Sequence, residues 1–329
     1  MNYKNIKFFF FLFIGIFLFK WVYDFFGSSE SIKLIEDNKS RLYLIVLIHI
    51  PTLFFDSLAW RVFIKKGNLS LFWSFIITWI SQASGRFFPT GTVTGEFIRI
   101  YLGTKKGLTF YESSSTVFAD LVIATFSLFI MASLSTLILI SDNAAFLDNE
   151  KSVYVFISLI IIFFGCLFFY YFVKKRIIKV FLKKNYFFNL KPKKETIKFL
   201  IKLDLSLYKL SMRKTDVVKA TFIRLLGWIS GAVEIYVFLS IIGIEVSLVD
   251  VILIESFTGI IRSIAFFIPA GLGIQELAFI LIGNYVGLGD SISFSMAIGR
   301  RIREVAVGLP AVFTWFILFR KTKKKGSKL

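Results

Sequence analysis

Long apolar runs constrain this chain more than any other feature. Six runs approach or exceed the ~20 residues that an α-helix needs to cross a bilayer. They lie near residues 6–26, 41–64, 109–139, 151–173, 217–242 and 291–319. Hydrophobic residues make up 56% of the 329-residue chain, where about half is usual for a soluble domain. The sequence therefore predicts an all-α polytopic membrane protein with about six full transmembrane helices.

Two further apolar segments, 70–104 and 247–286, are interrupted in the middle by proline and glycine. Their flanks of about 13 to 19 residues are marginal or short for a crossing at 1.5 Å per residue. Proline ends the incoming helix and glycine permits a turn. We therefore predict two re-entrant helical hairpins, with breaks at Pro89, Gly91, Gly95, Pro269, Gly271 and Gly273.

Charge indicates which loops face the cytoplasm. The segment 174–216 carries fourteen Lys/Arg against three acids and the tail 320–329 is basic, whereas the loop 141–151 is acidic. Basic loops beside spans mark the cytoplasmic face and its anionic lipids, so the formal charge of +19 does not indicate nucleic acid. We predict a multi-pass protein of the plasma (inner) membrane with both termini in the cytoplasm.

The second broken segment repeats the first. A shift of 180 residues aligns 87–120 with 267–300, and ten of the 34 aligned positions are identical, most of them Pro, Gly, Glu or Ser. This similarity predicts one integral membrane domain, 1–329, built from repeat 1 (about 41–139) and repeat 2 (about 217–319). Under the predicted sidedness the repeats are inverted, an arrangement that many transporters use.

Charges inside apolar segments are costly, so they must pair or line a hydrated groove. The set is Arg86, Glu96, Arg99, Asp120, Glu234, Glu255, Arg262, Glu276, Arg300, Arg301, Arg303 and Glu304. The N-terminus of a half-helix also attracts anions, and Glu96 and Glu276 lie just inside the two outgoing half-helices. Alternatively, each glutamate only caps its own helix.

From this set we predict a groove for an anionic head group, because a guanidinium matches phosphate bidentately. Its candidate residues are Arg86, Glu96, Arg99, Arg262 and Glu276. A second group either lines the groove or forms structural ion pairs, and consists of Asp120, Arg300, Arg301, Arg303 and Glu304. Asp120 and Arg300 occupy equivalent repeat positions and are expected to pair with each other, and Arg300 is also spaced to pair with Glu304 on one helix face.

The remaining sequence features have simpler interpretations. His49 is expected to be packed or bonded to backbone. The one cysteine, Cys166, predicts neither a disulfide framework nor a metal cluster. The cytoplasmic segment 174–216 has apolar residues at near-helical spacing, which predicts an amphipathic helix on the inner leaflet or, alternatively, a lid. Those apolar residues are Ile197, Leu200, Ile201, Leu207, Tyr208 and Leu210.

Two spaced motifs carry a family resemblance. They comprise Pro89, Gly91, Gly95, Glu96, Arg99 and Asp120 in the first half, and Pro269, Gly271, Gly273 and Glu276 in the second. With these motifs the chain resembles the flippase-like membrane family typified by the transmembrane region of lysylphosphatidylglycerol synthases. The resemblance implies lipid handling in the cell envelope. The chain departs from it at Ala270 and Gln275, where a glycine and an arginine are often found.

The leading hypothesis is a flippase-like transporter that moves a phospholipid or polyprenyl-linked glycolipid between leaflets. We expect no enzyme activity, cofactor or metal, and we expect membrane lipids and a separate lipid-modifying enzyme as partners. The sequence has no nucleotide-binding loop of the Gly-x-x-x-x-Gly-Lys type, which favours ion gradients or downhill transport. A membrane-embedded transferase acting on a lipid phosphate and a small-solute secondary transporter are the alternatives.

Overall fold

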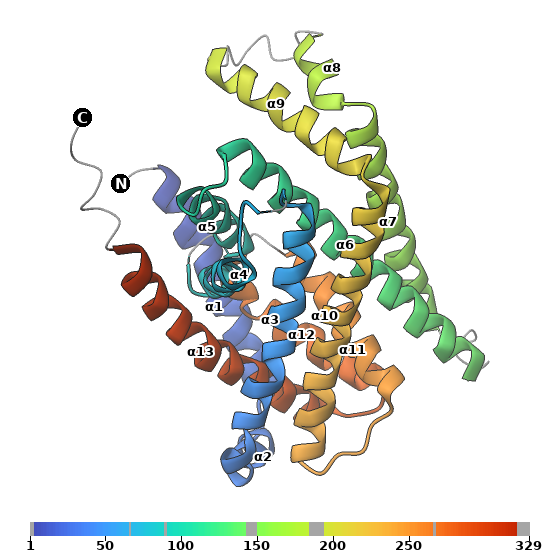
Figure 1. Ribbon diagram of the computed structural model, residues 1–329. Coiled ribbons are helices and arrows are strands. Elements are labelled where there is room, and N and C mark those ends of the chain that lie inside the picture. The colour runs from blue at the N-terminus through green and yellow to red at the C-terminus, as the bar shows by residue number, and fades with distance from the viewer. Residues whose placement is uncertain are drawn as a thin grey trace. The chain divides into compact units, whose positions relative to one another are not determined.

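The computed structural model describes residues 3–65, 67–88, 91–142, 150–183, 194–265 and 268–320, and every element in these ranges is helical (Figure 1). The elements are α1 (Tyr3–Phe26), α2 (Ser29–Asp37), η1 (Lys39–Arg41), α3 (Tyr43–Phe63), α4 (Leu71–Phe87), α5 (Gly91–Lys105), α6 (Phe110–Asp142), α7 (Glu150–Lys174), α8 (Ile177–Lys183), α9 (Lys194–Ser211), α10 (Lys214–Ile241), α11 (Leu248–Ile264), η3 (Pro269–Gly271), α12 (Ile274–Tyr285) and α13 (Asp290–Arg320).

Each of the six predicted spans is a single helix, namely α1, α3, α6, α7, α10 or α13. Within the described residues, four stretches are long and apolar enough to cross a membrane: Lys39–Phe63, Phe110–Ile138, Lys214–Ile241 and Asp290–Phe319. The chain is therefore a multi-pass membrane protein. Its full number of spans and the side on which each terminus lies remain predictions.

Each interrupted segment is a pair of helices. Pro89 lies outside the described residues, and α5 begins at Gly91, another predicted break residue. Gly95 was predicted to belong to the break and instead lies inside α5, where the Ser81 hydroxyl donates to its carbonyl over 2.9 Å. A Cβ at Gly95 would collide with the Ser81 carbonyl of α4 and would lie in tight contact with the Gly85 backbone, so this glycine permits close packing of α5 on α4.

The second interrupted segment packs α11 against α12, with η3 between them. The outgoing helix α12 begins at Ile274, directly after the predicted break residue Gly273. Its 12 residues span only about 18 Å, against a hydrocarbon thickness of about 30 Å. Leu272 of the turn and Gly273 contact α1, where a Cβ on Gly273 would collide with Leu18.

The described chain forms two compact units that share α3, α4, α5 and α10. Unit 1 comprises Met1–Phe54, Phe75–Arg99 and Trp228–Leu329, and unit 2 comprises Phe55–Ser74 and Ile100–Gly227. The main core of unit 1 gathers apolar side chains from α3 and from α10 to α13, among them Ile45, Leu239, Ile254, Phe279 and Ala297.

In unit 2, α9 packs along α6 and α7, as Figure 1 shows. The predicted amphipathic helix is therefore present, and part of its apolar face packs inside unit 2. Leu203 and Leu207 are buried against Val173, whereas Ile201 is exposed. Asp204 is also buried, where it accepts a hydrogen bond from Arg176 over 2.8 Å.

The two repeats share a local structure at the ends of α5 and α12. Leu108 N–H donates to the Gly103 carbonyl over 3.1 Å, and Leu288 N–H donates to the Gly283 carbonyl over 2.9 Å. Gly107 and Gly287 take the left-handed conformation (φ 106° and 88°) that this type of helix end requires. The residues matched in sequence thus form matching turns.

Candidate functional site: a buried arginine–glutamate cluster

Unit 1 contains a network of charged side chains within its apolar helices. We call it the arginine–glutamate cluster, and it consists of Arg86, Glu234, Glu255, Arg262, Glu276, Arg300, Arg301, Arg303 and Glu304. Charges at membrane depth are tolerated where they pair or meet water. The five arginines exceed the four glutamates by one formal charge, so the cluster as a whole favours an anion.

Arg301 ties this cluster to the turn between α11 and α12. Its guanidinium donates to the carbonyls of Ala270 (2.8 Å) and Gly271 (3.3 Å). Backbone that leaves helical geometry at membrane depth needs such partners, because lipid supplies none. Arg301 also pairs with Glu276 (2.6 Å) and with Glu304 (2.9 Å).

The turn itself uses left-handed backbone at Ala270 (φ 55°), Gly271 (φ 59°) and Gly273 (φ 77°). Glycine adopts this region without cost, but an L-residue with a Cβ does so rarely. This geometry favours glycine over alanine at the position of Ala270. Pairing of Glu276 with Arg301 of α13 gives this glutamate a role beyond its own helix.

Cations form the accessible edge of the cluster. Arg86 and Arg301 are 21% and 19% exposed in their side chains, whereas Glu304, with which both pair, is 4% exposed. Arg262 is half-buried and donates to the neutral Gln275 over 3.3 Å. Among the described residues, no carboxylate lies within ion-pair distance of Arg262. An approaching anion would therefore meet guanidinium groups first.

The deeper layer of the cluster is centred on Glu234 of α10. Arg303 donates to Glu234 over 2.9 Å and to His49 Nε2 over 3.2 Å. A guanidinium can only donate, so Nε2 must accept, and the proton of a neutral His49 lies on Nδ1. Nδ1 then donates to Glu234 over 3.0 Å. Of the two predicted alternatives for His49, a packed side chain is confirmed, and its ring nitrogens bond to side chains and not to backbone.

Two predicted ion pairs are also wrong. Arg300 pairs with Glu255 and, at 3.6 Å, with Glu234, and not with Asp120 or Glu304. Spacing along one helix or between repeats shows which groups share a face, but it does not show which other helices pack beside them. Here Glu234 of α10 and Glu255 of α11 lie nearer to Arg300. Glu304 pairs instead with Arg86 and Arg301.

Asp120 belongs to a separate group in unit 2, here called the Arg224 triad. Arg224 of α10 lies between Asp120 of α6 and Asp56 of α3, and pairs with both. Asp120 is fully buried, and Arg224 is 9% exposed in its side chain. The triad therefore joins three helices in a closed environment.

The first hairpin places Glu96 and Arg99 on one face of α5. Their closest charged atoms are 3.5 Å apart, at the limit of a hydrogen bond. Arg99 is buried and Glu96 is 20% exposed in its side chain. The ion pair between them is separate from the ion pairs that define the arginine–glutamate cluster.

His49, Asp56 and Arg224 were not predicted as ion-pair residues. Asp56 and Arg224 lie inside the apolar runs 41–64 and 217–242, so the rule that identified the other intramembrane charges would have found them. His49 gave a weaker signal, because a neutral histidine fits an apolar run without a charged partner.

Long helices, two broken helix pairs and buried ions define the class of this chain as a polytopic membrane protein with discontinuous helices. The chain belongs to the family described as Lysylphosphatidylglycerol synthase TM region, which matches residues 8–311. That range includes the whole arginine–glutamate cluster and the Arg224 triad. No curated protein and no solved structure matches the chain.

Proposed function

We propose that this protein moves an amphipathic lipid between membrane leaflets and that the accessible edge of the arginine–glutamate cluster receives its anionic head group. The observation that carries this proposal is the set of partly exposed guanidinium groups at Arg86, Arg262 and Arg301. Arg262 contributes most, because its hydrogen-bond partner is neutral. Phosphate is a better partner for it than an amide, since it offers charge and bidentate geometry.

The topology that suits this function is the inverted one predicted from sequence, with two re-entrant hairpins and both termini in the cytoplasm. In such folds, substrate sites lie near the midplane, where half-helices meet. The short length of α12 and the left-handed turn before it support a hairpin that ends within the membrane. The head group would pass along polar side chains while the acyl or isoprenoid chains remain in lipid. Family membership supports a lipid substrate.

A mechanism follows from Glu304, the glutamate that two arginines share. Arg86 and Arg301 both pair with Glu304, so an entering phosphate can replace that carboxylate as their partner. A buried carboxylate left without a cation is neutralised by proton uptake in preference to remaining charged. We therefore expect head-group entry to favour protonation of Glu304, and the reverse exchange to release the proton and the lipid.

The test is leaflet exchange of fluorescent phospholipids in liposomes containing the purified protein. Arg262→Gln should slow exchange of an anionic phospholipid by about fivefold, the effect of one cation worth about 1 kcal/mol, and Arg262→Lys should retain part of the rate. Glu304→Gln, Glu276→Gln and Glu96→Gln each remove the negative charge of one carboxylate, and their exchange rates show whether that charge is needed. Lys214→Gln, an exposed change on α10 in unit 2, is the matched control.

Normal exchange in a folded Arg262→Gln variant would exclude the proposed head-group site. Absence of exchange in the wild type with anionic, zwitterionic and polyprenyl-phosphate lipids would contradict lipid translocation. Competition separates the small-solute alternative, because a soluble head group such as glycerol phosphate should then compete as well as the whole lipid does.

A further inference from the structure

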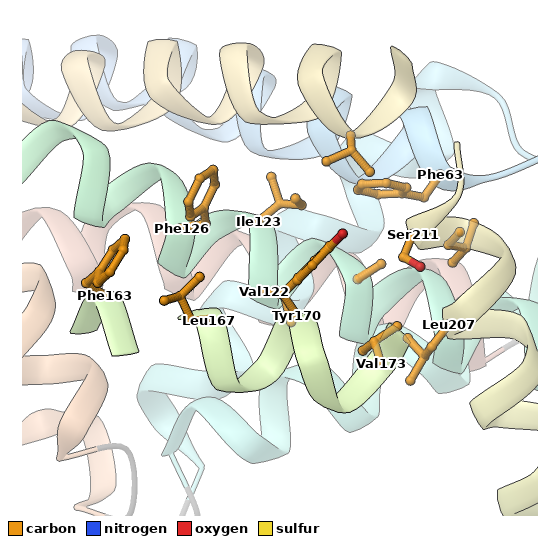
Figure 2. Close-up of a pocket in the computed structure, with 13 residues that line it drawn as sticks. Phe63, Val122, Ile123, Phe126, Phe163, Leu167, Tyr170, Val173, Leu207 and Ser211 are labelled. Carbon is orange, nitrogen blue, oxygen red and sulfur yellow. The ribbon is translucent and has the colours of Figure 1, made fainter. Parts of the chain in front are cut away.

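Unit 2 contains an apolar cavity that the proposed translocation does not use. It has a volume of about 390 Å³, within the range of pockets that bind drug-sized ligands. Its walls come from α6, α7, α9 and the adjoining ends of α3 and α10. Figure 2 shows it extending from Phe126 and Phe163 at one end to Phe63 and Ser211 at the other.

The cavity runs along the expected direction of a lipid chain. Val173 lies at the end of α7 that leads into the basic segment 174–216, and Phe163 lies ten residues earlier on the same helix. Ten helical residues correspond to about 15 Å of depth. The Ser211 end therefore lies near the predicted cytoplasmic surface, and the Phe163 end lies deeper in the hydrocarbon.

A second, basic pocket lies beside the shallow end. It is lined by Arg61, Lys65, Arg213, Asp216 and Lys219 and also has a volume of about 390 Å³. The two spaces share a wall, because Phe63 and Val217 line the cavity while Val62 and Asp216, their neighbours in the chain, line the basic pocket.

Arg213 lines the basic pocket, but its guanidinium is already bonded to other groups of the protein and is not the main anion-binding group. It pairs with Asp216 over 2.6 Å and donates to the Phe63 and Val62 carbonyls over 3.1 and 3.2 Å. These bonds join the end of α3 to the start of α10. Arg61, Lys65 and Lys219 remain as cations that give the pocket its positive charge.

We propose that unit 2 binds an anionic phospholipid of the inner leaflet at this place, with one acyl chain in the apolar cavity and the phosphate in the basic pocket. The order of the two spaces, basic at the surface and apolar in depth, is the order of charge and hydrocarbon in a phospholipid. This site is distinct from the arginine–glutamate cluster and does not depend on the proposed translocation.

The experiment measures retained lipid by native mass spectrometry. The purified full-length protein is offered equimolar dioleoylphosphatidylglycerol and dioleoylphosphatidylcholine in detergent. The wild type should retain phosphatidylglycerol in preference. Lys65→Gln and Lys219→Gln should each reduce that retention about fivefold, as expected for one cation near an anionic lipid. Lys214→Gln, on the same helix as Lys219 and outside both spaces, should leave it unchanged.

A second pair of variants tests the chain-binding cavity. Val122→Trp on α6 should reduce retention of both phospholipids, because the larger side chain fills the space that Figure 2 shows around Val122. Val122→Phe repeats the test with a smaller change, and Leu134→Trp, an exposed change on the same helix, is the control. Thermal unfolding shows whether each variant is folded.

Unchanged retention in folded Val122→Trp and Val122→Phe would overturn the proposal. Equal retention of dioleoylglycerol would contradict the role of the phosphate, and equal retention of glycerol phosphate would contradict the role of the chain. Folded Lys65→Gln and Lys219→Gln should leave leaflet exchange unchanged, since both residues belong to unit 2 and lie outside the arginine–glutamate cluster. Binding at this site and leaflet exchange can therefore fail independently.

Discussion

The arginine–glutamate cluster of unit 1 and the Arg224 triad of unit 2 use the same two helices differently. In unit 2, Asp56 of α3 and Asp120 of α6 pair with Arg224 of α10. In unit 1, His49 of α3 and Arg303 of α13 pair with Glu234 of α10. Each unit thus joins α3, α10 and one further span through buried polar groups, α6 in unit 2 and α13 in unit 1.

The difference lies in charge and access. The triad has one cation between two carboxylates, and its central residues are buried. The cluster has an excess of cations and presents Arg86 and Arg301 at a partly exposed edge. A closed, fully paired group suits a structural role, whereas an open group with an excess charge suits a ligand. Substitutions can test this division.

The largest effect is expected in the triad. Asp120→Asn removes the fully buried one of the two carboxylates that pair with Arg224 and leaves Asp56 as the other. Breaking a buried ion pair from one side costs about 3–5 kcal/mol, and the remaining pair with Asp56 offsets part of that cost. The melting temperature and the yield of folded protein should fall strongly, while exchange per folded molecule should persist.

Leu134→Ala on α6 is the control for this experiment, because its side chain is exposed and it lies outside the triad. A folded, stable Asp120→Asn protein that had lost lipid exchange would place Asp120 in the transport route. The Arg224 triad could then no longer be assigned a structural role that the arginine–glutamate cluster lacks.

Sequence predicted the helices well because their signal is local. Apolar length identified α3, α6, α10 and α13, and the proline and glycine positions identified both helix breaks. Burial of intramembrane charge also followed directly from its cost in lipid.

Partners could not be predicted in the same way, because they depend on which helices pack together. Arg300 finds Glu255 on α11, and Asp120 finds Arg224 on α10, although the repeat suggested that Arg300 and Asp120 would pair. The left-handed turn at Ala270 was equally hidden, since alanine gives no signal for positive φ.

A moderate effect is expected for His49→Phe, which keeps a ring of similar size. The change removes one hydrogen-bond partner from Glu234 and one from Arg303, and an unsatisfied buried group costs about 1–3 kcal/mol. Thermal unfolding should detect the loss, and exchange per folded molecule should be unchanged if this deeper layer is structural. Selective loss of exchange would extend the functional site inward to Glu234.

A smaller effect comes from moving a cation within the accessible edge. Arg262 and Gln275 form a hydrogen-bonded pair, so the double variant Arg262→Gln/Gln275→Arg keeps both side-chain types and exchanges their positions. It should recover part of the roughly fivefold loss expected for Arg262→Gln alone, as measured by exchange of phosphatidylglycerol against phosphatidylcholine. No recovery in a folded double variant would show that the exact position of Arg262 matters more than the charge of the edge.

The smallest effect is expected at the turn that Arg301 holds. Ala270 has φ 55°, a conformation that costs an L-residue roughly 1–2 kcal/mol, and the greater freedom of glycine in the unfolded chain offsets part of the gain. Ala270→Gly should therefore stabilise unit 1 by up to about 1 kcal/mol, whereas Ala278→Gly inside α12 should destabilise it by about 1 kcal/mol. Because Arg301 binds the carbonyl and not the side chain of Ala270, exchange should be unchanged. Destabilisation by both variants would mean that packing of the Ala270 methyl group outweighs the strain of its backbone. The turn would then be a closely packed structural element, as the Arg224 triad is.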